Sequence, residues 1–228
     1  MQQNVASPRQ CGGQELAVQT YLQHGFATLQ CCAAAGTAKE EADERLLTDL
    51  AQDMRKLAEA IPFNRGPGRT CVNAWENNDR APWRRALHRL LQDPRVPAIL
   101  LTAGTPYFYD CGGDIVAPYT EGGDPCTWHQ DSPHPWWWTV LSVLCTNVDA
   151  TNGPMKINSW ASPDQDDADH TLSFEGSLGH VIVRDVAAWH RASSNTSDKD
   201  RPMPSFRFCS EEGMGIHIDE LVLQDSLL

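Results

Sequence analysis

The sequence lacks long apolar runs and has little positive charge, and both shortages exclude classes of protein. TVLSVLC (139–145), one of its longest apolar stretches, is far shorter than the roughly 20 residues that a helix needs to cross a bilayer. Lys and Arg total 18 against 30 Asp and Glu, a net charge of -12. Nucleic acids and anionic membranes are therefore poor partners, because both require a basic face. The N-terminal MQQNVASPRQCGGQ has no apolar segment typical of a secretory signal, so we expect a soluble intracellular protein, in the cytoplasm.

The remaining composition is that of a turn-rich globular protein. Hydrophobic residues make up 41% of the chain, with 16 glycines and 15 prolines. Eight cysteines are present, and without a secretory signal we expect them to be reduced thiols. The length of 228 residues can bury the core of one large domain. We expect a single domain over 1–228, mainly helical in 1–94 and mainly β in 95–228.

Helical signals are confined to the N-terminal part. Residues 38–61 carry apolar side chains at helical spacing, Thr37 and Glu40 resemble a capping box, and Pro62 ends the helix. Shorter helices are expected over 16–29 and 82–91, and NRGPGRT (64–70) is expected to form a loop.

After Pro94, short β-type runs alternate with turn signals. The runs are VPAILLT, TPYFYD, DIVAPY, TWHQD, WWWTVLSVLC, PMKINSW, HVIVRD, PSFRFC and IHIDELVL. This order predicts an α+β protein with a mainly β core, a barrel or sandwich whose N-terminal helices pack on one side. The acidic stretch SPDQDDADH (162–170) is expected to be a solvated loop.

The segment TWHQDSPHPWWWT (127–139) contains the first candidate site. On a β-strand, residues two apart project from one face, so His129 and Asp131 could reach a single metal ion. A 2-His-1-carboxylate iron site needs one more histidine and leaves positions open for ligands. The H-x-D pattern alone is weak evidence, because a chain with eight histidines and many aspartates produces it by chance.

His190 is the candidate for the third ligand, since it follows the buried-strand pattern HVIVRD and a turn. Arg201 comes next, just before the strand-like PSFRFC. A guanidinium is a planar fork that can hold a carboxylate through two hydrogen bonds. A histidine ligand closely followed by an arginine suits a metal-chelated 2-oxo diacid.

Together WHQD (128–131), NGPM (152–155) and the His190-to-Arg201 spacing resemble the phytanoyl-CoA dioxygenase-like family, over roughly 95–209. That family is a branch of the Fe(II)- and 2-oxoglutarate-dependent oxygenases. The resemblance implies a double-stranded β-helix (jelly-roll or cupin-like) core, with His129, Asp131 and His190 as iron ligands. It also implies that Arg201 binds the far carboxylate of 2-oxoglutarate, and Ser142 is our candidate for a further cosubstrate contact.

The resemblance further implies a hydroxylase that consumes 2-oxoglutarate and O2, releases succinate and CO2, and acts on a small organic molecule. Related halogenases replace the carboxylate ligand with a small residue, so Asp131 favours hydroxylation. We expect a monomer or weak dimer. The chain departs from the family at Ala192, where many members have serine, and at NSWA (158–161), where many have P-G-S-H.

Other interpretations remain open at this point. A non-catalytic, cupin-like binding protein would share the barrel, and a zinc-dependent isomerase could use the same ligands. Cys126 and His129 form C-x-x-H, but no second cysteine pair stands at finger-like spacing. We expect His134, His170, His180 and His217 to be surface or structural residues. Of the three tryptophans at 136–138, at least one is expected in the core, and one could line the pocket.

Overall fold

The computed structural model describes residues 13–31, 38–60, 63–66, 68–74, 81–120, 127–158, 160 and 171–224. The helices in these ranges are α1 (Gln14–His24), α2 (Ala38–Ala60), α3 (Ala81–Leu91), α4 (Arg95–Thr102) and α5 (Ile218–Gln224). The strands are β1 (Phe26–Gln30), β2 (Phe63–Gly66), β3 (Arg69–Asn73), β4 (Tyr107–Val116), β5 (Trp138–Val143), β6 (Met155–Ile157), β7 (Leu172–Phe174), β8 (His180–Asp185), β9 (His190–Ala192), β10 (Arg201–Cys209) and β11 (Ile216–His217). Among the described helices we find no candidate for a membrane-spanning segment, judged by length and hydropathy.

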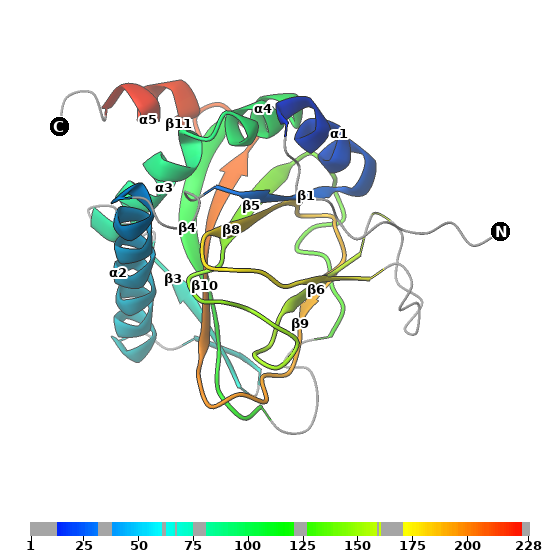
Figure 1. Cartoon of the computed structure of the whole chain (residues 1–228). Helices are drawn as coiled ribbons and strands as arrows, with labels where there is room; N and C mark the ends of the chain where they lie inside the picture. The colour runs from blue at the N-terminus through cyan, green and yellow to red at the C-terminus, as the bar shows by residue number, and fades with distance from the viewer. Residues whose placement is uncertain are drawn as a thin grey trace.

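The strands form two antiparallel sheets (Figure 1). The larger sheet has the order β1-β8-β5-β10-β4-β3-β2, and β11 adds to β4. The smaller sheet has the order β7-β6-β9. The predicted α+β class with a mainly β core is therefore confirmed.

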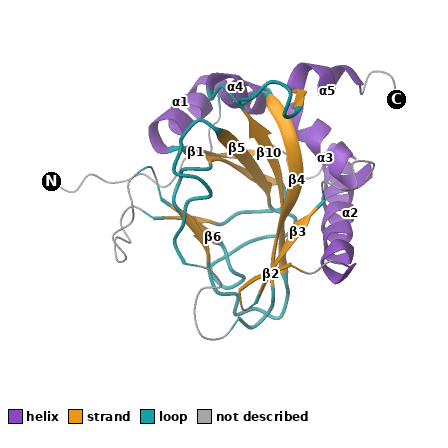
Figure 2. Ribbon diagram, turned by 180° about the vertical axis from the view of Figure 1, so that it is seen from behind, coloured by secondary structure: helices purple, strands orange, loops and turns teal. Residues whose placement is uncertain are grey.

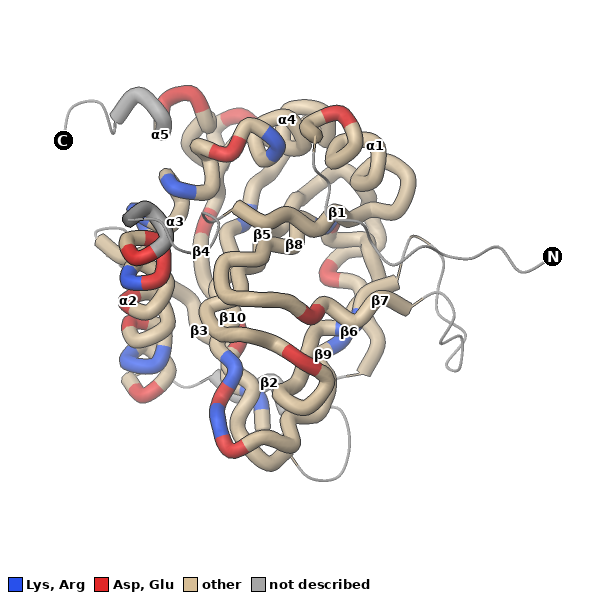
Figure 3. The backbone as a smooth tube through the Cα atoms, in the orientation of Figure 1, with Lys and Arg blue, Asp and Glu red and all other residues tan. Residues whose placement is uncertain are grey.

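The helices pack outside the larger sheet. Figure 2 shows α2 and α3 beside β3 and β4, and α1 and α4 near the end of the sheet at β1. Leu50 and Met54 of α2 are fully buried in the main core, and the Trp83 ring of α3 lies 5.9 Å from that of Phe206 in β10. The charged residues of α2 follow its length in Figure 3, as expected for an amphipathic helix with a solvated face.

Alternation along the strands separates this helix-side core from the space between the two sheets. Leu141, Val183 and Phe206 belong to the helix-side core. Ile182 belongs to a second, smaller core, which also contains Ile157 of the smaller sheet. A strand residue next to a member of the helix-side core points the opposite way, into the space between the sheets. The polar residues Ser142, Arg184 and Ser205 are next to Leu141, Val183 and Phe206 and therefore face this space, where the candidate site lies.

Two helix predictions need correction. The first helix ends at His24, not near 29, because Gly25 adopts a left-handed conformation (φ 76°) and its N–H bonds to the Tyr21 carbonyl. Residues 26–30 then form β1. VPAILLT was expected as a strand but forms most of α4, in which Pro97 lies in the first turn, where proline is tolerated. The helices over 38–60 and 81–91 agree closely with the prediction.

Three β predictions also differ. The stretch 64–70, expected as a loop, contributes to the β2–β3 hairpin, with Gly68 at φ 75° in the turn. TPYFYD and DIVAPY form parts of one strand, β4. IHIDELVL is a strand only at 216–217 and then becomes α5. The capping box at Thr37, the loop at 162–170, Cys126 and His170 lie outside the described residues.

Candidate metal centre

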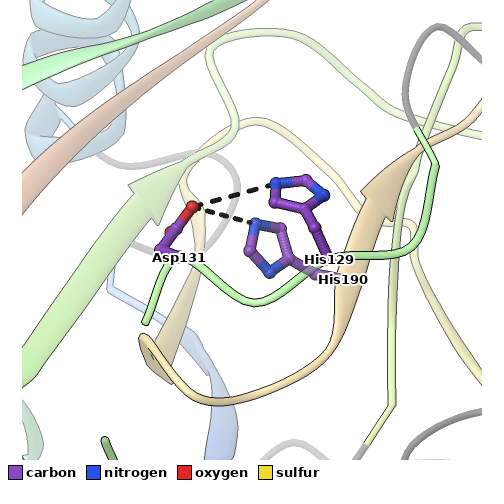
Figure 4. Close-up of side chains that lie close together, drawn as sticks. All are labelled: His129, Asp131 and His190. Atoms are coloured by element: carbon purple, nitrogen blue, oxygen red, sulfur yellow. Dashed lines mark ion pairs between the residues drawn. The ribbon is translucent and has the colours of Figure 1, made fainter. Parts of the chain in front are cut away.

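Three side chains predicted as iron ligands lie together between the sheets (Figure 4). One potential ligand atom from each of His129, Asp131 and His190 lies within 4.8 Å of the other two. Oδ1 of Asp131 is 3.8 Å from Nε2 of His129 and 3.8 Å from Nε2 of His190. The two imidazole rings have their centroids 4.3 Å apart.

Backbone hydrogen bonds hold the two ligand segments together. The His129 N–H donates to the His190 carbonyl at 3.1 Å, and the His190 N–H donates to the His129 carbonyl at 3.0 Å. The Asp131 N–H donates to the Val186 carbonyl at 3.0 Å, and the Gln130 side-chain amide donates to Ala187. The segment 127–131 is thus attached directly to the chain that follows β8.

This arrangement corrects the prediction that His129 and Asp131 lie on a β-strand. Only His129 forms a β-bridge, and the segment up to 137 is irregular. Pro133 and Pro135 lack the N–H that a strand ladder requires, which explains why β5 begins only at 138. The two side chains converge because of the docking contacts and not because of strand alternation.

Both histidines have a defined orientation. Nδ1 of His129 lies 2.9 Å from the Thr127 carbonyl, and Nδ1 of His190 lies 3.0 Å from the Ala188 carbonyl. A carbonyl can only accept, so each Nδ1 carries the proton and each Nε2 presents its lone pair to the other ligands. Histidines that bind metals are commonly oriented in this way.

The charge state of the cluster also suits a cation. Burial alone would raise the pKa of Asp131, but the charge of Arg184 and its hydrogen bond to the carboxylate outweigh burial, and the pKa lies well below its usual range. Burial, reinforced by the charge of Arg184, lowers the pKa of His190 well below its usual value. At neutral pH the site therefore offers a carboxylate and a neutral buried imidazole.

A cavity of about 920 Å³ opens beside this cluster. Its lining includes Asp131, His190, Tyr109, Trp137 and Trp138. A smaller compartment of about 30 Å³ lies next to it, and the two share His190, Arg184 and Ser205 among their lining residues.

The inner compartment contains both predicted cosubstrate residues. Arg201 is 1% exposed and lines the inner compartment, as does Ser142, whose hydroxyl lies 2.8 Å from that of Ser205. Ala192 also lines the inner compartment, so the position at which many phytanoyl-CoA dioxygenase-like proteins have serine presents only a methyl group here.

The tryptophans follow the prediction in part. Trp137 and Trp138 line the outer cavity, and the Trp138 ring packs against Tyr109 with centroids 4.4 Å apart. None of the three is in the buried core, contrary to expectation: Trp136 and Trp137 are 38% and 40% exposed, and Trp138 is half-buried. Trp136 has a positive φ of 64°, and its N–H donates to the buried Asp185 carboxylate at 2.8 Å.

Several charged residues of the cavity escaped sequence reasoning. Arg184 of β8 donates from Nη2 to Oδ2 of Asp131 at 2.7 Å. Arg69 pairs with Asp114, and Arg207 pairs with Asp110. For Arg184 a signal was present, since an arginine inside the apolar run HVIVRD must either be paired or face a site.

Comparison with known proteins supports the fold. No family model and no curated protein matches the sequence. The epimerase SnoN, solved with Fe3+, alpha ketoglutarate and nogalamycin RO, aligns with TM-score 0.64 and 15% identity, covering 91% of this chain and 88% of SnoN. AviO1 from Streptomyces viridochromogenes Tue57 aligns with TM-score 0.62 and 20% identity over 86% and 95% of the two chains.

A Pseudomonas putida prolyl-4-hydroxylase aligns with TM-score 0.60 and 14% identity, covering 88% of this chain and all of that one (100%). At such low sequence identities, these structural alignments establish similarity of fold alone. The chain has the double-stranded β-helix fold of 2-oxoglutarate-dependent oxygenases, as predicted.

Proposed function

We propose that this protein is an Fe(II)- and 2-oxoglutarate-dependent oxygenase that hydroxylates a C–H bond of a small organic molecule, releasing succinate and CO2. The observation that supports this most directly is the convergence of His129, Asp131 and His190 beside a cavity. Two imidazoles and one carboxylate are the ligand set of non-haem Fe(II) oxygenases.

The geometry fits a bound divalent metal. Metal–nitrogen and metal–oxygen bonds of about 2.1 Å place neighbouring ligand atoms about 3.0 to 3.4 Å apart. The 3.8 Å separations from Asp131 Oδ1 to each Nε2 are slightly wider, so small side-chain rotations suffice to close the site. Both Nε2 lone pairs are available, because each Nδ1 is committed to a backbone carbonyl.

The other residues take roles that follow from their positions. Arg201, buried in the inner compartment, would bind the far carboxylate of 2-oxoglutarate, and Ser142 would contribute a hydroxyl. The outer cavity would receive the substrate against Trp137 and Trp138 and shield it from bulk water. Ferrous iron bound with 2-oxoglutarate and O2 would supply the oxidising power for the C–H bond.

The motifs support placement in the phytanoyl-CoA dioxygenase-like branch, and the carboxylate at position 131 supports hydroxylation rather than halogenation. Solved proteins of this fold include an epimerase and a carbocyclase by their names, so the reaction type needs its own test. We propose one oxygenase domain over 1–228, acting as a monomer or weak dimer, because a single solved chain of this fold, the alpha ketoglutarate dependent epimerase SnoN, aligns with 91% of the chain.

An anaerobic titration tests the proposal. Protein mixed with Fe(II) and 2-oxoglutarate should develop the charge-transfer absorption of the iron–keto-acid chelate. A colourless mixture would favour a cupin-like binding protein, and zinc in freshly prepared protein would favour an isomerase. A succinate-release screen over a metabolite library would then identify the substrate, because turnover should raise decarboxylation above the uncoupled background.

A further inference from the structure

Arg184 is a buried arginine beside the candidate metal centre to which the proposed mechanism gives no role. It lies on β8 two residues after Ile182, which belongs to the small core between the sheets. Its side chain is 8% exposed, and its neighbours Val181 and Val183 are fully buried. A permanently charged group in such a strand is costly unless it has partners.

Only part of the Arg184 guanidinium is satisfied by the protein. Nη2 donates to Oδ2 of Asp131 at 2.7 Å. Nε and Nη1 are buried and have no hydrogen-bond partner among the described residues. A buried donor without an acceptor costs about 1 to 3 kcal/mol, and more when it is charged. The two nitrogens therefore have capacity for an anionic ligand.

The position of Arg184 indicates which end of a ligand it can reach. Arg184 and His190 line both the outer cavity and the inner compartment, whereas Arg201 lines only the inner compartment. Arg184 thus lies at the junction, in direct contact with a predicted metal ligand, and Arg201 lies farther inside. Arg69 is a further buried arginine of this compartment and pairs with Asp114, and the half-buried Arg191 lies over the Trp128 ring. Arg184 and Arg201 are therefore the two buried guanidinium groups placed to receive the two carboxylates of a diacid.

The pairing with Asp131 also leaves this arrangement compatible with a metal. Oδ2 accepts from Arg184, while Oδ1 is the oxygen that lies 3.8 Å from Nε2 of each histidine. One oxygen of Asp131 can therefore bind the metal while the other holds the guanidinium in place. A carboxylate bound to the same metal likewise has a second oxygen, which can accept from Nε or Nη1.

We infer that Arg184 binds the metal-proximal carboxylate of 2-oxoglutarate, so that the cosubstrate lies between Arg184 at the junction and Arg201 at the inner end. This inference rests on the proposed function. Arg184 would then contact two carboxylates, that of Asp131 and the metal-proximal carboxylate of 2-oxoglutarate.

Binding of two 2-oxo acids to Arg184→Met and Arg201→Met tests the inference. The probes are 2-oxoglutarate and 2-oxopentanoate, which has the same five-carbon chain with a methyl group in place of the distal carboxylate. Dissociation constants are measured anaerobically with Fe(II) by the charge-transfer absorption and by calorimetry. Thermal unfolding shows whether each variant is folded, and Fe(II) binding without 2-oxo acid shows whether it binds the metal. Arg184→Lys is the second variant if Arg184→Met does not fold or does not bind Fe(II).

We expect Arg184→Met to lower the affinity for both 2-oxo acids by about ten- to a hundredfold, because a hydrogen bond to a charged group is lost. Arg201→Met should lower only the affinity for 2-oxoglutarate, because 2-oxopentanoate has no distal carboxylate for Arg201 to bind. Arg184→Lys, which keeps the charge without the fork, should weaken both acids by an intermediate factor.

Wild-type affinity of folded, metal-loaded Arg184→Met for both acids would overturn the inference and leave the proposed function standing. A loss confined to 2-oxoglutarate would overturn it too, since Arg184 would then act on the distal carboxylate. Failure of the wild-type protein itself to bind 2-oxoglutarate with Fe(II) would instead remove the proposed function together with the inference.

Discussion

Replacement of Asp131 by alanine is the most direct perturbation of the candidate centre. In the metal-free cluster the charge of Asp131 balances that of Arg184, whose Nη2 lies 2.7 Å away. Asp131→Ala removes one of three ligands and leaves the arginine charge unbalanced beside the metal position. Loss of residues that only support a ligand already costs 10- to 100-fold in metal affinity. We therefore expect Asp131→Ala to weaken Fe(II) binding at least about 100-fold, about 2.7 kcal/mol, and to abolish succinate formation.

A competition titration with a chromophoric chelator under anaerobic conditions measures this affinity directly. Asp219→Ala is a matched control, since it removes the same charge from a side chain that is 80% exposed. The control should bind Fe(II) like the wild type. Wild-type metal affinity and full succinate production by Asp131→Ala would show that Asp131 is not a ligand, and the proposed mechanism would fall with it.

The same variant has a pH-dependent effect on stability. The pKa of Asp131 is lowered in the folded protein, so its ionised form stabilises the fold. This contribution is fully present above the pKa of an unfolded aspartate and is lost as the pH falls through the lowered value. In metal-free protein we expect Asp131→Ala to cost about 1 to 3 kcal/mol at pH 7. The difference in unfolding free energy should shrink towards acid pH, and a difference independent of pH would contradict the lowered pKa.

Three further predictions concern other residues. Arg201→Ala should lose the charge-transfer absorption at low 2-oxoglutarate and regain it at high concentration; unchanged affinity would exclude Arg201 from the cosubstrate site. Burial raises the pKa of Cys111 to about 12, so at pH 8 this thiol should resist alkylation in native protein and react after unfolding, as mass spectrometry can check. Asp43→Ala should cost about 3 kcal/mol in urea unfolding while leaving Fe(II) affinity unchanged, because it breaks a two-bond ion pair with Arg89 between α2 and α3, and a cost near zero would refute this.

Local patterns predicted the fold where they were unambiguous. The helix over 38–60 was predictable because its apolar residues recur at helical spacing and the proline at position 62 is a stop signal in the sequence. The helix at VPAILLT was not predictable, because a short apolar run is equally consistent with a buried strand and a buried helix. The segment can form the helix α4 because its proline, Pro97, lies in the first turn, where no backbone N–H is needed. The sequence alone does not show whether such a proline begins a helix or interrupts one.

The candidate ligands could be predicted because their residue types and order form a known motif. Arg184 could not be assigned in the same way, since its partner Asp131 lies 53 residues earlier and no local spacing connects them. The pairs Arg69–Asp114 and Arg207–Asp110 are of the same kind, formed between strands that meet only in the folded sheet.

The backbone contacts explain how an irregular segment can hold a metal site. Two hydrogen bonds join His129 to His190, and one joins Asp131 to Val186, so the two ligand segments form one bridged unit. The Arg184 side chain adds a third connection, from β8 to Asp131. Because these contacts fix the ligand atoms within 4.8 Å before any metal arrives, binding does not have to order a flexible loop. The entropy cost of assembling the site is therefore met during folding, and metal binding does not have to offset it.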